Sequence, residues 1–203
     1  PLFVSARRLR RLRRGLPRAL GAWSLDSGGF TELSMYGGWT VSAEEHVAQV
    51  RRFRDEVGNM DWAAPQDWMC EPQVLAKTGL SIPEHQQRTI DNYLELRGLA
   101  PDLPFIPVLQ GWSLDDYYRC LDQYAARGVD LQREPVVGLG TVCRRQSTQE
   151  GANIVRRLSA VGGLNLHGFG VKVLGLRAVG QFLVSADSLA WSFTARMKKI
   201  KLE

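Results

Sequence analysis

The sequence has few cysteines, no long apolar run and no common nucleotide-binding fingerprint. Its three cysteines, Cys70, Cys120 and Cys143, stand 50 and 23 positions apart, and no CxxC pair occurs. This spacing excludes a disulfide scaffold and a zinc site built from close cysteine pairs, and we expect a reducing, cytoplasmic location. No run of 18 apolar residues is present, so we expect no membrane span. The N-terminal residues lack the apolar core of a secretory leader.

Nucleotide-binding loops are also missing, since no GxGxxG follows the first apolar run and no GxxxxGKS/T occurs. What is present is an ordinary globular composition, with 44% hydrophobic and 23% charged residues in a chain of 203. A chain of this size and composition buries a sizeable core. We therefore expect residues 1–203 to form a single domain.

Acidic residues are absent from the first 20 positions, which are rich in arginine. The arginines there are Arg7, Arg8, Arg10, Arg11, Arg13, Arg14 and Arg18. They carry +7 in a chain of net charge +5, so the remaining 183 residues sum to −2. Ala6, Leu9, Leu12 and Leu16 recur between them at helical spacing. The segment is either a solvated amphipathic helix or a face that contacts phosphate groups, and a transit peptide fits it less well.

Short apolar runs alternate with helical patterns along the chain. The expected strands are 2–5, 22–26, 62–66, 105–110, 136–140, 166–171 and 182–187. The expected helices are 6–14, 42–57, 83–97, 113–127, 147–160 and 188–197, with a short one near 173–180. Ser42 with Glu45 and Ser113 with Asp116 resemble the capping boxes that begin helices. Strands that alternate with helices in this way predict a parallel sheet with helices outside it.

A doubly wound sheet and a (β/α)8 TIM barrel both fit this alternation, and the polar residues at the strand ends favour the barrel. Nearly every expected strand ends in such residues, which are Asp26, Asp67, Gln110, the Gly138-Leu139-Gly140 turn, His167 and Asp187. The C-terminal strand ends of a barrel surround one pocket, so these scattered residues would converge. Seven strands leave a (β/α)8 barrel one short. A first strand upstream of Pro1, an open barrel and completion by a partner chain each account for that.

The strand-end residues suit a site for a flat heteroaromatic base. Asp26 opens Asp-Ser-Gly-Gly-Phe, whose glycines let the backbone approach a ligand and whose Phe30 offers a stacking face. The same run also forms ordinary tight turns. Asp67 lies in an apolar stretch and is either paired structurally or accepts from ligand donors. Gln110 can donate and accept, and bare amides of the 138–140 turn suit a carbonyl oxygen.

A carboxylate beside a sugar adds a second function to such a site. An aspartate that faces C1′ of a nucleotide can attack it, as carboxylates do in retaining glycosyl transfer. Two acids in separate roles are expected to differ in pKa, the nucleophile being ionised and its partner exchanging protons. Asp26 and Asp187 are the candidates, although Asp187 could instead cap the helix that follows it. His167 is either an ordinary core histidine or a part of the same site.

The order of these motifs resembles a known enzyme family. DSGGF, PQDWMCEP, VLQGW, VGLG, LHGFG and SADS follow one another over roughly residues 20–195. They are similar to the tRNA-guanine transglycosylase superfamily, whose members are (β/α)8 barrels that exchange a guanine in RNA for a 7-deazaguanine such as queuine. Within that superfamily the chain most resembles the short bacterial and phage relatives that are linked to 7-deazaguanine in DNA.

The resemblance implies the chemistry of the site. Asp187 would be the nucleophile that forms a covalent link to C1′ of the target nucleotide. Asp26 would be the general acid/base, which hands a proton to the departing guanine and takes one from the incoming base. The family's zinc module, a cysteine cluster with a histidine beyond the last strands, has no counterpart in this sequence. We therefore expect no metal or other cofactor.

The resemblance also implies how the base is held. The base-binding set would be Phe30, Asp67, Gln110, Gly138, Leu139, Gly140, His167 and Gly168. Asp67 would accept from the N1–H and 2-amino groups, while Gln110 and the amides of the glycine turn would address the carbonyl. Phe30 matches the family's stacking aromatic. His167 stands where the tRNA enzymes carry an apolar stacking residue.

DNA is the substrate that the resemblance implies, and the lack of an RNA-binding appendage in this sequence weakens the tRNA alternative. A base inside a duplex is out of reach of an enzyme, so the DNA must be single-stranded or the base must be flipped out. Four cations that follow expected strands would guide the backbone, although each alone is typical of a solvated surface charge. They are Arg144, Arg145, Lys172 and Arg196.

The sequence thus predicts a guanine transglycosylase-type glycosyltransferase, which exchanges a guanine in DNA for a 7-deazaguanine base through a covalent aspartyl-nucleoside. Three alternatives remain open at this point. One is a tRNA-guanine transglycosylase, and another is a non-catalytic nucleic-acid or deazapurine-binding subunit of a modification complex. The third is a nucleoside or sugar hydrolase that uses Asp26 and Asp187. A homodimer and a complex with a partner subunit are equally open.

Overall fold

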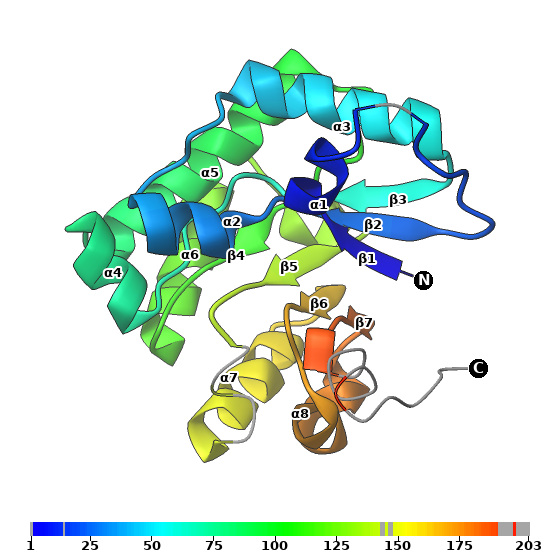
Figure 1. Cartoon of the computed structure of the whole chain (residues 1–203). Coiled ribbons are helices and arrows are strands. Elements are labelled where there is room, and N and C mark those ends of the chain that lie inside the picture. Colours follow the sequence, from blue (N-terminus) through cyan, green and yellow to red (C-terminus); the bar gives the residue numbers. More distant parts are fainter. Residues whose placement is uncertain (1, 14, 143–144, 146–147, 191–196, 198–203) are drawn as a thin grey trace.

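Strands and helices alternate along the chain in the computed structural model, which describes residues 2–13, 15–142, 145, 148–190 and 197 (Figure 1). The strands are β1 (Leu2–Ser5), β2 (Trp23–Asp26), β3 (Met60–Ala63), β4 (Val108–Leu109), β5 (Val137–Leu139), β6 (Leu166–Gly168) and β7 (Ser185–Ala186). The α-helices are α1 (Ala6–Arg10), α2 (Gly29–Thr31), α3 (Ala43–Val57), α4 (Pro72–Thr78), α5 (Ile82–Leu99), α6 (Leu114–Ala126), α7 (Gln149–Ala160) and α8 (Val173–Val179). A π-helical turn covers Glu32–Tyr36, and 3-10 turns cover Leu131–Arg133 and Gly180–Phe182.

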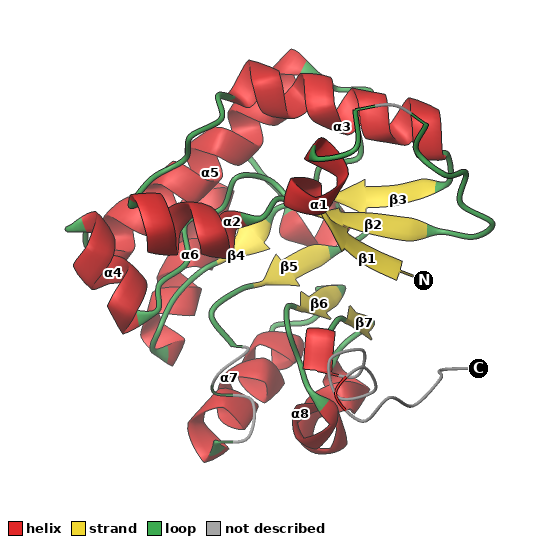
Figure 2. Cartoon of the chain, in the orientation of Figure 1, coloured by secondary structure: helices red, strands yellow, loops and turns green. Residues whose placement is uncertain are grey.

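Every strand pair in the described residues is parallel. β1, β2 and β3 form one sheet and β4, β5, β6 and β7 form a second, each in chain order. An isolated parallel bridge between Ala63 and Phe105 joins the end of β3 to the segment that enters β4. Helices lie outside the strands, with α3 over the first sheet and α7 and α8 beneath β6 and β7 (Figure 2). The predicted parallel α/β architecture is confirmed. No backbone pair among the described residues joins β7 to β1.

Serine capping boxes set the starts of the three longest described helices. Ser42, Ser81 and Ser113 each accept from the backbone N–H three residues on, and the acid at that position accepts from the serine's own N–H. Each box satisfies two of the N–H groups that a helix start leaves without partners. The boxes at Ser42 and Ser113 are the ones that the sequence predicts, and that at Ser81 has the same pattern.

Some elements differ from the sequence pattern. The helix expected over 6–14 is only five residues long. The strand expected over 105–110 keeps two ladder residues, because Pro107 has no N–H to donate. Helices α2 and α4 and the π-helical turn have no counterpart among the expected elements. Most of the helix expected over 188–197 lies outside the described residues.

Two large apolar clusters fill the space between the strands and the helices. One packs β4, β5 and β6 against α6 and α7, and in it the side chains of Tyr117 and Tyr124 are completely buried. The other packs β2 against α1 and α3, with Leu25 and Phe53 at its centre. Burial of side chains of this size stabilises the fold by about 2 kcal/mol each. The strand ends are therefore held on a rigid framework.

A smaller aromatic cluster joins the two sheets. Phe3 on β1, Trp62 on β3, His167 on β6 and Phe169 just beyond β6 pack against one another. The ring centroids of Trp62 and His167 lie 4.7 Å apart, and those of Phe3 and Phe169 lie 5.8 Å apart. Aromatic pairs at such separations stabilise a fold beyond the area they bury. The first and last parts of the chain meet in this cluster.

Two of the cysteines are buried and form no disulfide. Cys70 and Cys120 are free thiols, and Cys143 lies outside the described residues. Burial raises the pKa of the Cys120 thiol to about 12, so this thiol stays protonated at neutral pH. As for membranes, none of the described helices combines the length and the apolar character that a span requires.

Candidate active site

The C-terminal ends of β1 and β2 bring Ser5 next to Asp26. The two residues are partners in the parallel register of these strands. The Asp26 carboxyl accepts hydrogen bonds from the Ser5 hydroxyl and from the backbone N–H of Gly28. Burial raises the pKa of Asp26 above its ordinary value, the charge of Asp187 raises it further, and the two hydrogen bonds oppose the rise. Asp26 therefore holds a proton more readily than a surface aspartate, as a proton-exchanging group must.

Asp67 lies in the loop after β3 and faces Gln110 at the end of β4. The Gln110 Nε2 donates to Asp67 Oδ2 at 2.6 Å, and the Ser27 hydroxyl lies 3.5 Å from Oδ1. Burial raises the pKa of the Asp67 carboxyl to about 7, and the charge of Asp26 adds to the rise, while the Gln110 hydrogen bond opposes it. Asp67 is thus half ionised near neutral pH, unlike an ordinary aspartate.

Thr141, just after β5, fixes the direction of the Gln110 amide. The Thr141 hydroxyl accepts from the Cys70 N–H at 2.9 Å and donates to Gln110 Oε1 at 2.7 Å. With its oxygen held there, the carboxamide turns its NH2 group toward Asp67. Thr141 does this from the left-handed region, at φ +58°, which a β-branched residue adopts only under strain.

The loop after β2 lies directly against Asp67. Gly28 has φ +87°, and a Cβ there would lie 2.8 Å from Cγ of Arg7. A Cβ at Gly29 would lie 3.4 Å from Asp67 Oδ1. The two glycines thus allow a close approach of the backbone, as the sequence predicts. Phe30 follows them directly in the chain, and 46% of its surface is exposed.

The glycines of the β5 turn leave room for neighbouring side chains. A Cβ at Gly140 would lie 2.3 Å from the Gln110 Nε2, and a Cβ at Gly138 would lie 2.6 Å from the Phe169 ring. Any side chain at either position would displace the group it meets. Gly140 in particular gives the Gln110 amide the space in which it reaches Asp67.

The expectation that this turn presents bare amides is wrong at both glycines. The N–H of Gly138 donates to the Pro107 carbonyl at 2.9 Å, and that of Gly140 donates to the Leu109 carbonyl at 3.0 Å. Both amides are used because β5 continues its ladder with β4 to the end of the strand. Leu139 between them is completely buried, so its side chain belongs to the core. Gly138 and Gly140 therefore contribute the room that they leave for neighbouring side chains, and not free N–H donors.

Asp187 follows β7 and is held by two donors on one oxygen. Its Oδ1 accepts from the Gly170 N–H at 2.9 Å and lies 3.3 Å from His167 Nε2. Because a carboxylate only accepts, Nε2 of His167 is the donor of this contact, and its Nδ1 forms a hydrogen bond with the Ser185 hydroxyl at 2.8 Å. Among the described residues Oδ2 has no hydrogen-bond partner. Asp187 is therefore fixed through one of its two oxygens.

The competing interpretation of Asp187 as a helix cap finds no support in these contacts. The carboxylate bonds to Gly170 and His167, and the hydroxyl of Ser188 accepts from the Ala190 N–H at 3.2 Å. Gly168, on β6, contributes its carbonyl, which accepts from the Asp187 N–H at 3.4 Å. His167 is buried and packed among aromatic rings, so it is at once a core residue and a partner of the candidate nucleophile.

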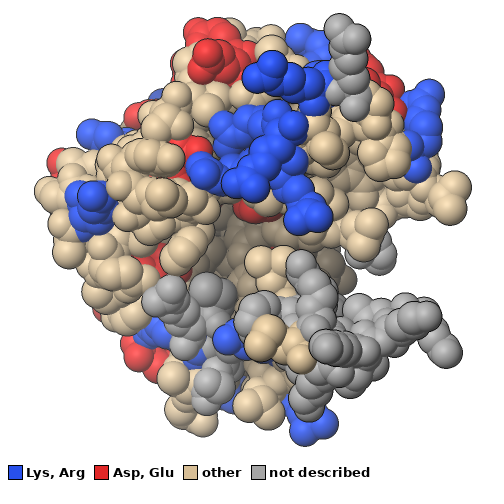
Figure 3. All heavy atoms as spheres, viewed as in Figure 1, with Lys and Arg blue, Asp and Glu red and all other residues tan. Residues whose placement is uncertain are grey.

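These groups form one constellation at the C-terminal ends of the strands. Asp67 interacts electrostatically with Asp26, and Asp26 with Asp187, so the three carboxyls lie in one region. Figure 3 shows a recess near the centre of this face, with Lys and Arg side chains gathered directly above it in the region of α1. The arrangement offers a carboxylate held by two hydrogen bonds, a buried carboxyl with a raised pKa and a hydrogen-bonded Asp67–Gln110 pair.

The sequence matches a known protein family along nearly its whole length. The DpdA family, described as DeoxyPurine in DNA protein A, matches residues 1–202. The chain belongs to the DpdA family. Membership implies a role in the deazapurine modification of DNA, with DNA as the substrate, and suggests a transglycosylase-like enzyme. No curated relative matches the chain significantly.

The cations predicted to contact DNA have different positions in this DpdA-family chain. Arg145 is only 7% exposed, lies over the Trp112 ring at 4.1 Å and pairs with Glu150 at 2.5 Å. Its prediction as a free phosphate contact is wrong, because these partners hold it inward. Lys172 is exposed just before α8. Arg144 and Arg196 lie outside the described residues.

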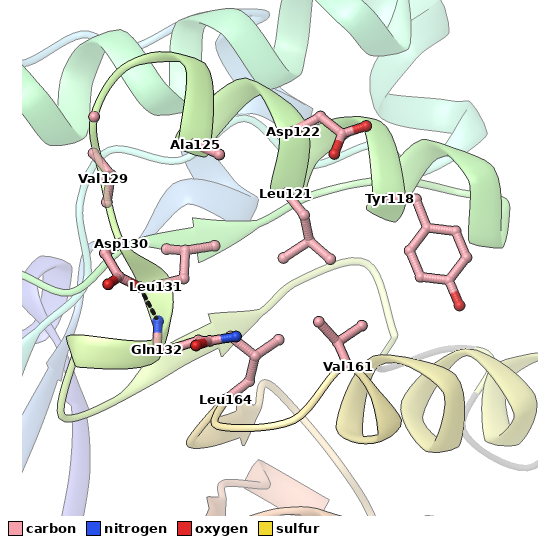
Figure 4. Close-up of a pocket in the computed structure, with 11 residues that line it drawn as sticks. Tyr118, Leu121, Asp122, Ala125, Val129, Asp130, Leu131, Gln132, Val161 and Leu164 are labelled. Carbon is pink, nitrogen blue, oxygen red and sulfur yellow. Dashed lines mark hydrogen bonds between the residues drawn. The ribbon is translucent and has the colours of Figure 1, made fainter.

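A separate groove lies on another part of the described molecule. It has a volume of about 620 Å³ and lies between α6 and the end of α7 (Figure 4). Apolar side chains line most of it, among them Leu121, Leu131, Val161 and Leu164. It carries none of the candidate residues, and nothing in the sequence motifs points to it.

Several residues of the site have no signal in the sequence. Thr141, Ser27 and Ser185 are ordinary polar residues until the fold places them beside Gln110, Asp67 and His167. Glu32 is buried beneath two arginines, and only its position shortly after Asp-Ser-Gly-Gly-Phe could have drawn attention to it. Within the described residues, no group of three or more His, Cys, Asp or Glu side chains could hold a metal ion.

Proposed function

We propose that the protein exchanges a guanine in DNA for a 7-deazaguanine base by two successive displacements at C1′, as in the tRNA-guanine transglycosylase superfamily. The observation that carries the proposal is the pair of carboxyl groups at the ends of β2 and β7. Asp187 has one oxygen anchored and one without a hydrogen-bond partner among the described residues, which suits a nucleophile. Asp26 has a raised pKa and lies near Asp187, which suits an acid/base.

In the first displacement, Oδ2 of Asp187 forms a bond to C1′ as the bond between C1′ and N9 of guanine breaks. The electron pair of that bond stays with guanine, which takes a proton from the Asp26 carboxyl. The Oδ1 hydrogen bonds to His167 and Gly170 hold the carboxylate in place during the attack. The product of this step is an aspartyl-nucleoside and a free, neutral guanine.

In the second displacement, a 7-deazaguanine occupies the place that guanine has left. The ionised Asp26 takes the N9 proton of this base, and N9 then attacks C1′ and displaces the Asp187 carboxylate. Both side chains return to their starting protonation states, so the cycle consumes one free base and releases another. Retention at C1′ follows from the two inversions.

Base recognition rests on Asp67 and Gln110. The Asp67 carboxylate accepts from the N1–H and 2-amino groups, which guanine and its 7-deaza analogues share. The NH2 group of Gln110, which Thr141 orients, lies beside Asp67 and donates a hydrogen bond to the carbonyl oxygen of the base. The exposed ring of Phe30 stacks on the base. Glycines at 138, 140 and 168 leave the space that these groups need.

We further propose that the strands form a (β/α)8-type barrel in a single domain over residues 1–203. Parallel strands in chain order and the aromatic cluster between β1, β3 and β6 support this arrangement. The DNA base enters the site from a single strand or flipped out of a duplex. Lys172, Arg144 and Arg196 are the cations that we assign to the DNA backbone.

A base-exchange assay tests the proposal. Purified protein and radiolabelled guanine are incubated separately with single-stranded DNA, duplex DNA and tRNA. We expect label in DNA, no detectable incorporation by Asp187→Asn, and a 10²- to 10⁴-fold slower rate for Asp26→Asn. Asp61→Asn, an exposed position on β3, is the matched control and should exchange like the wild type.

The other outcomes each overturn a part of the proposal. Label only in tRNA would make the chain a tRNA enzyme. Release of guanine from DNA without uptake of label would indicate a nucleoside hydrolase. DNA or deazaguanine binding with no incorporation, and no effect of Asp187→Asn on that binding, would indicate a non-catalytic subunit.

A further inference from the structure

The arginines of the N-terminal segment fall into two groups with different partners. Arg7 and Arg10 pair with Glu32, at 2.8 Å and 3.4 Å. Arg8, Arg11 and Arg13 are exposed, and within the described part of the chain no acid pairs with any of them. One group thus attaches the segment to the rest of the molecule, whereas the other leaves three guanidinium groups facing solvent.

Glu32 is built to receive those two arginines. It is 1% exposed, and it also accepts from the Thr40 N–H at 3.1 Å and from the Thr40 hydroxyl. Burial alone would raise the pKa of Glu32, but the Thr40 hydrogen bonds and the charges of Arg10 and Arg7 together hold it below its ordinary value. Glu32 is therefore ionised at neutral pH, and a buried carboxylate with these partners fixes their positions.

The segment lies at the edge of the candidate active site. α1 begins at Ala6, directly after Ser5, whose hydroxyl bonds to Asp26. The stem of Arg7 packs on Gly28, and Glu32 lies two residues after Phe30 in the chain. In Figure 3, Lys and Arg side chains gather above the recess in the region of α1. A phosphate held by this segment would thus be close to the nucleotide whose base enters the site.

We infer that Arg8, Arg11 and Arg13 form a binding surface for the DNA sugar-phosphate backbone, and that the Arg7/Arg10–Glu32 ion pairs fix this surface to the segment that runs from Asp26 at the end of β2 to Glu32. The inference rests on the proposed function, because it takes DNA as the polyanion. Exposed guanidinium groups bind phosphates bidentately and release counterions when they do so. Because the buried Glu32 fixes this segment, the three arginines hold the DNA backbone at a defined position relative to Asp26 rather than only attracting DNA in general.

Salt-dependent DNA binding tests the surface. Fluorescein-labelled single-stranded DNA of mixed sequence is titrated with the full chain, and anisotropy is followed over a series of KCl concentrations. The test variant carries Arg8→Gln, Arg11→Gln and Arg13→Gln. The matched control carries Arg156→Gln, Arg157→Gln and Arg177→Gln, three exposed arginines on α7 and α8 with the same change in charge.

We expect the test variant to bind at least ten times more weakly at low salt and to lose about 2 from the slope of log Kd against log salt. In the control variant, the loss of affinity and the loss of slope should each be less than a third of those in the test variant. An equal loss in both variants, or wild-type binding by the test variant, overturns the inference. Circular dichroism of both variants shows whether they are folded, and the exposed positions make a folding defect unexpected.

The role of Glu32 is tested by Glu32→Gln in the base-exchange assay. The triple arginine variant should show a higher KM for DNA and an unchanged kcat. Glu32→Gln should instead show a lower kcat and an unchanged affinity for DNA. Exchange into DNA with an unchanged KM in the test variant overturns the inference and leaves the proposed function intact. DNA binding through the three arginines without any exchange overturns the proposed function and leaves the surface intact.

Discussion

Asp67 makes stability depend on pH in the opposite sense to an ordinary ion-paired aspartate. Its pKa is raised from 3.8 to about 7 by burial, so between these values the folded state binds more protons than the unfolded chain does. The free energy of unfolding therefore falls as pH rises from 4 to 7. The raised pKa of Asp26 acts in the same direction.

Asp67→Asn should flatten this dependence. We expect the variant to match the wild type at pH 4 and to exceed its unfolding free energy at pH 8 by up to about 4 kcal/mol, at 1.36 kcal/mol per pKa unit. Urea unfolding at a series of pH values measures this, and Asp61→Asn, at the surface of β3, is the control. If Asp67→Asn keeps the wild-type slope, the Asp67 carboxyl is not the group that titrates.

His167 is expected to act through Asp187 rather than through the base. His167→Leu keeps a buried apolar side chain among Phe3, Trp62 and Phe169 but removes the donor to Asp187 Oδ1. A hydrogen bond to a charged group contributes about 1.5–3 kcal/mol, so kcat for base exchange should fall about 10- to 100-fold. KM for the free base should change little, and a rise in that KM with kcat unchanged would instead place His167 against the base.

Among the helices, α6 offers the clearest test of a local signal. Ser113→Ala removes the side-chain acceptor of its capping box and should lower the free energy of unfolding by about 1 kcal/mol. Ser159→Ala, inside α7, removes a serine with no capping role and should be neutral or slightly stabilising. Chemical denaturation of both variants measures the difference, and equal effects would deny the cap a special role.

Elements with local signals are the ones that the sequence predicts well. The starts of α3 and α6 follow from capping boxes, and the strands follow from short apolar runs. Helix α4 was missed although Pro72 at its start and Gly79 after its end are such signals. The π-helical turn has no such local signal, and its first residue, Glu32, finds its partners Arg7 and Arg10 more than 20 positions away.

The candidate site likewise contains residues that a local signal predicts and residues that no local signal predicts. Asp26, Asp67, Gln110 and Asp187 stand at the ends of recognisable strands, and the order of their motifs suffices to group them. Thr141 is different, because its partners are Gln110 and Cys70, 31 and 71 positions away. The state of the amides at 138 and 140 also depends on how far β5 pairs with β4, which the composition of the turn does not reveal.

For the molecule as a whole, the aromatic cluster predicts cooperative unfolding of the two sheets. Phe3 touches Trp62, His167 and Phe169, which belong to distant parts of the chain. We expect one transition, at the same urea concentration by tryptophan fluorescence and by circular dichroism. Phe3→Ala should lower the unfolding free energy by about 3 kcal/mol. Two separate transitions in the wild type would show that the sheets are independent units.

Thr141 bears on how this protein would respond to selection. Glycine, or asparagine at a smaller penalty than threonine, adopts φ +58° more readily, so the backbone conformation alone favours a replacement of Thr141. The hydroxyl favours threonine, because its partners, the Cys70 N–H and the Gln110 carboxamide, are buried and a glycine variant would leave both without it. Backbone strain and base discrimination therefore act on this one position in opposite directions. A replacement selected only because it relieves the backbone would give a protein that chooses its base less strictly.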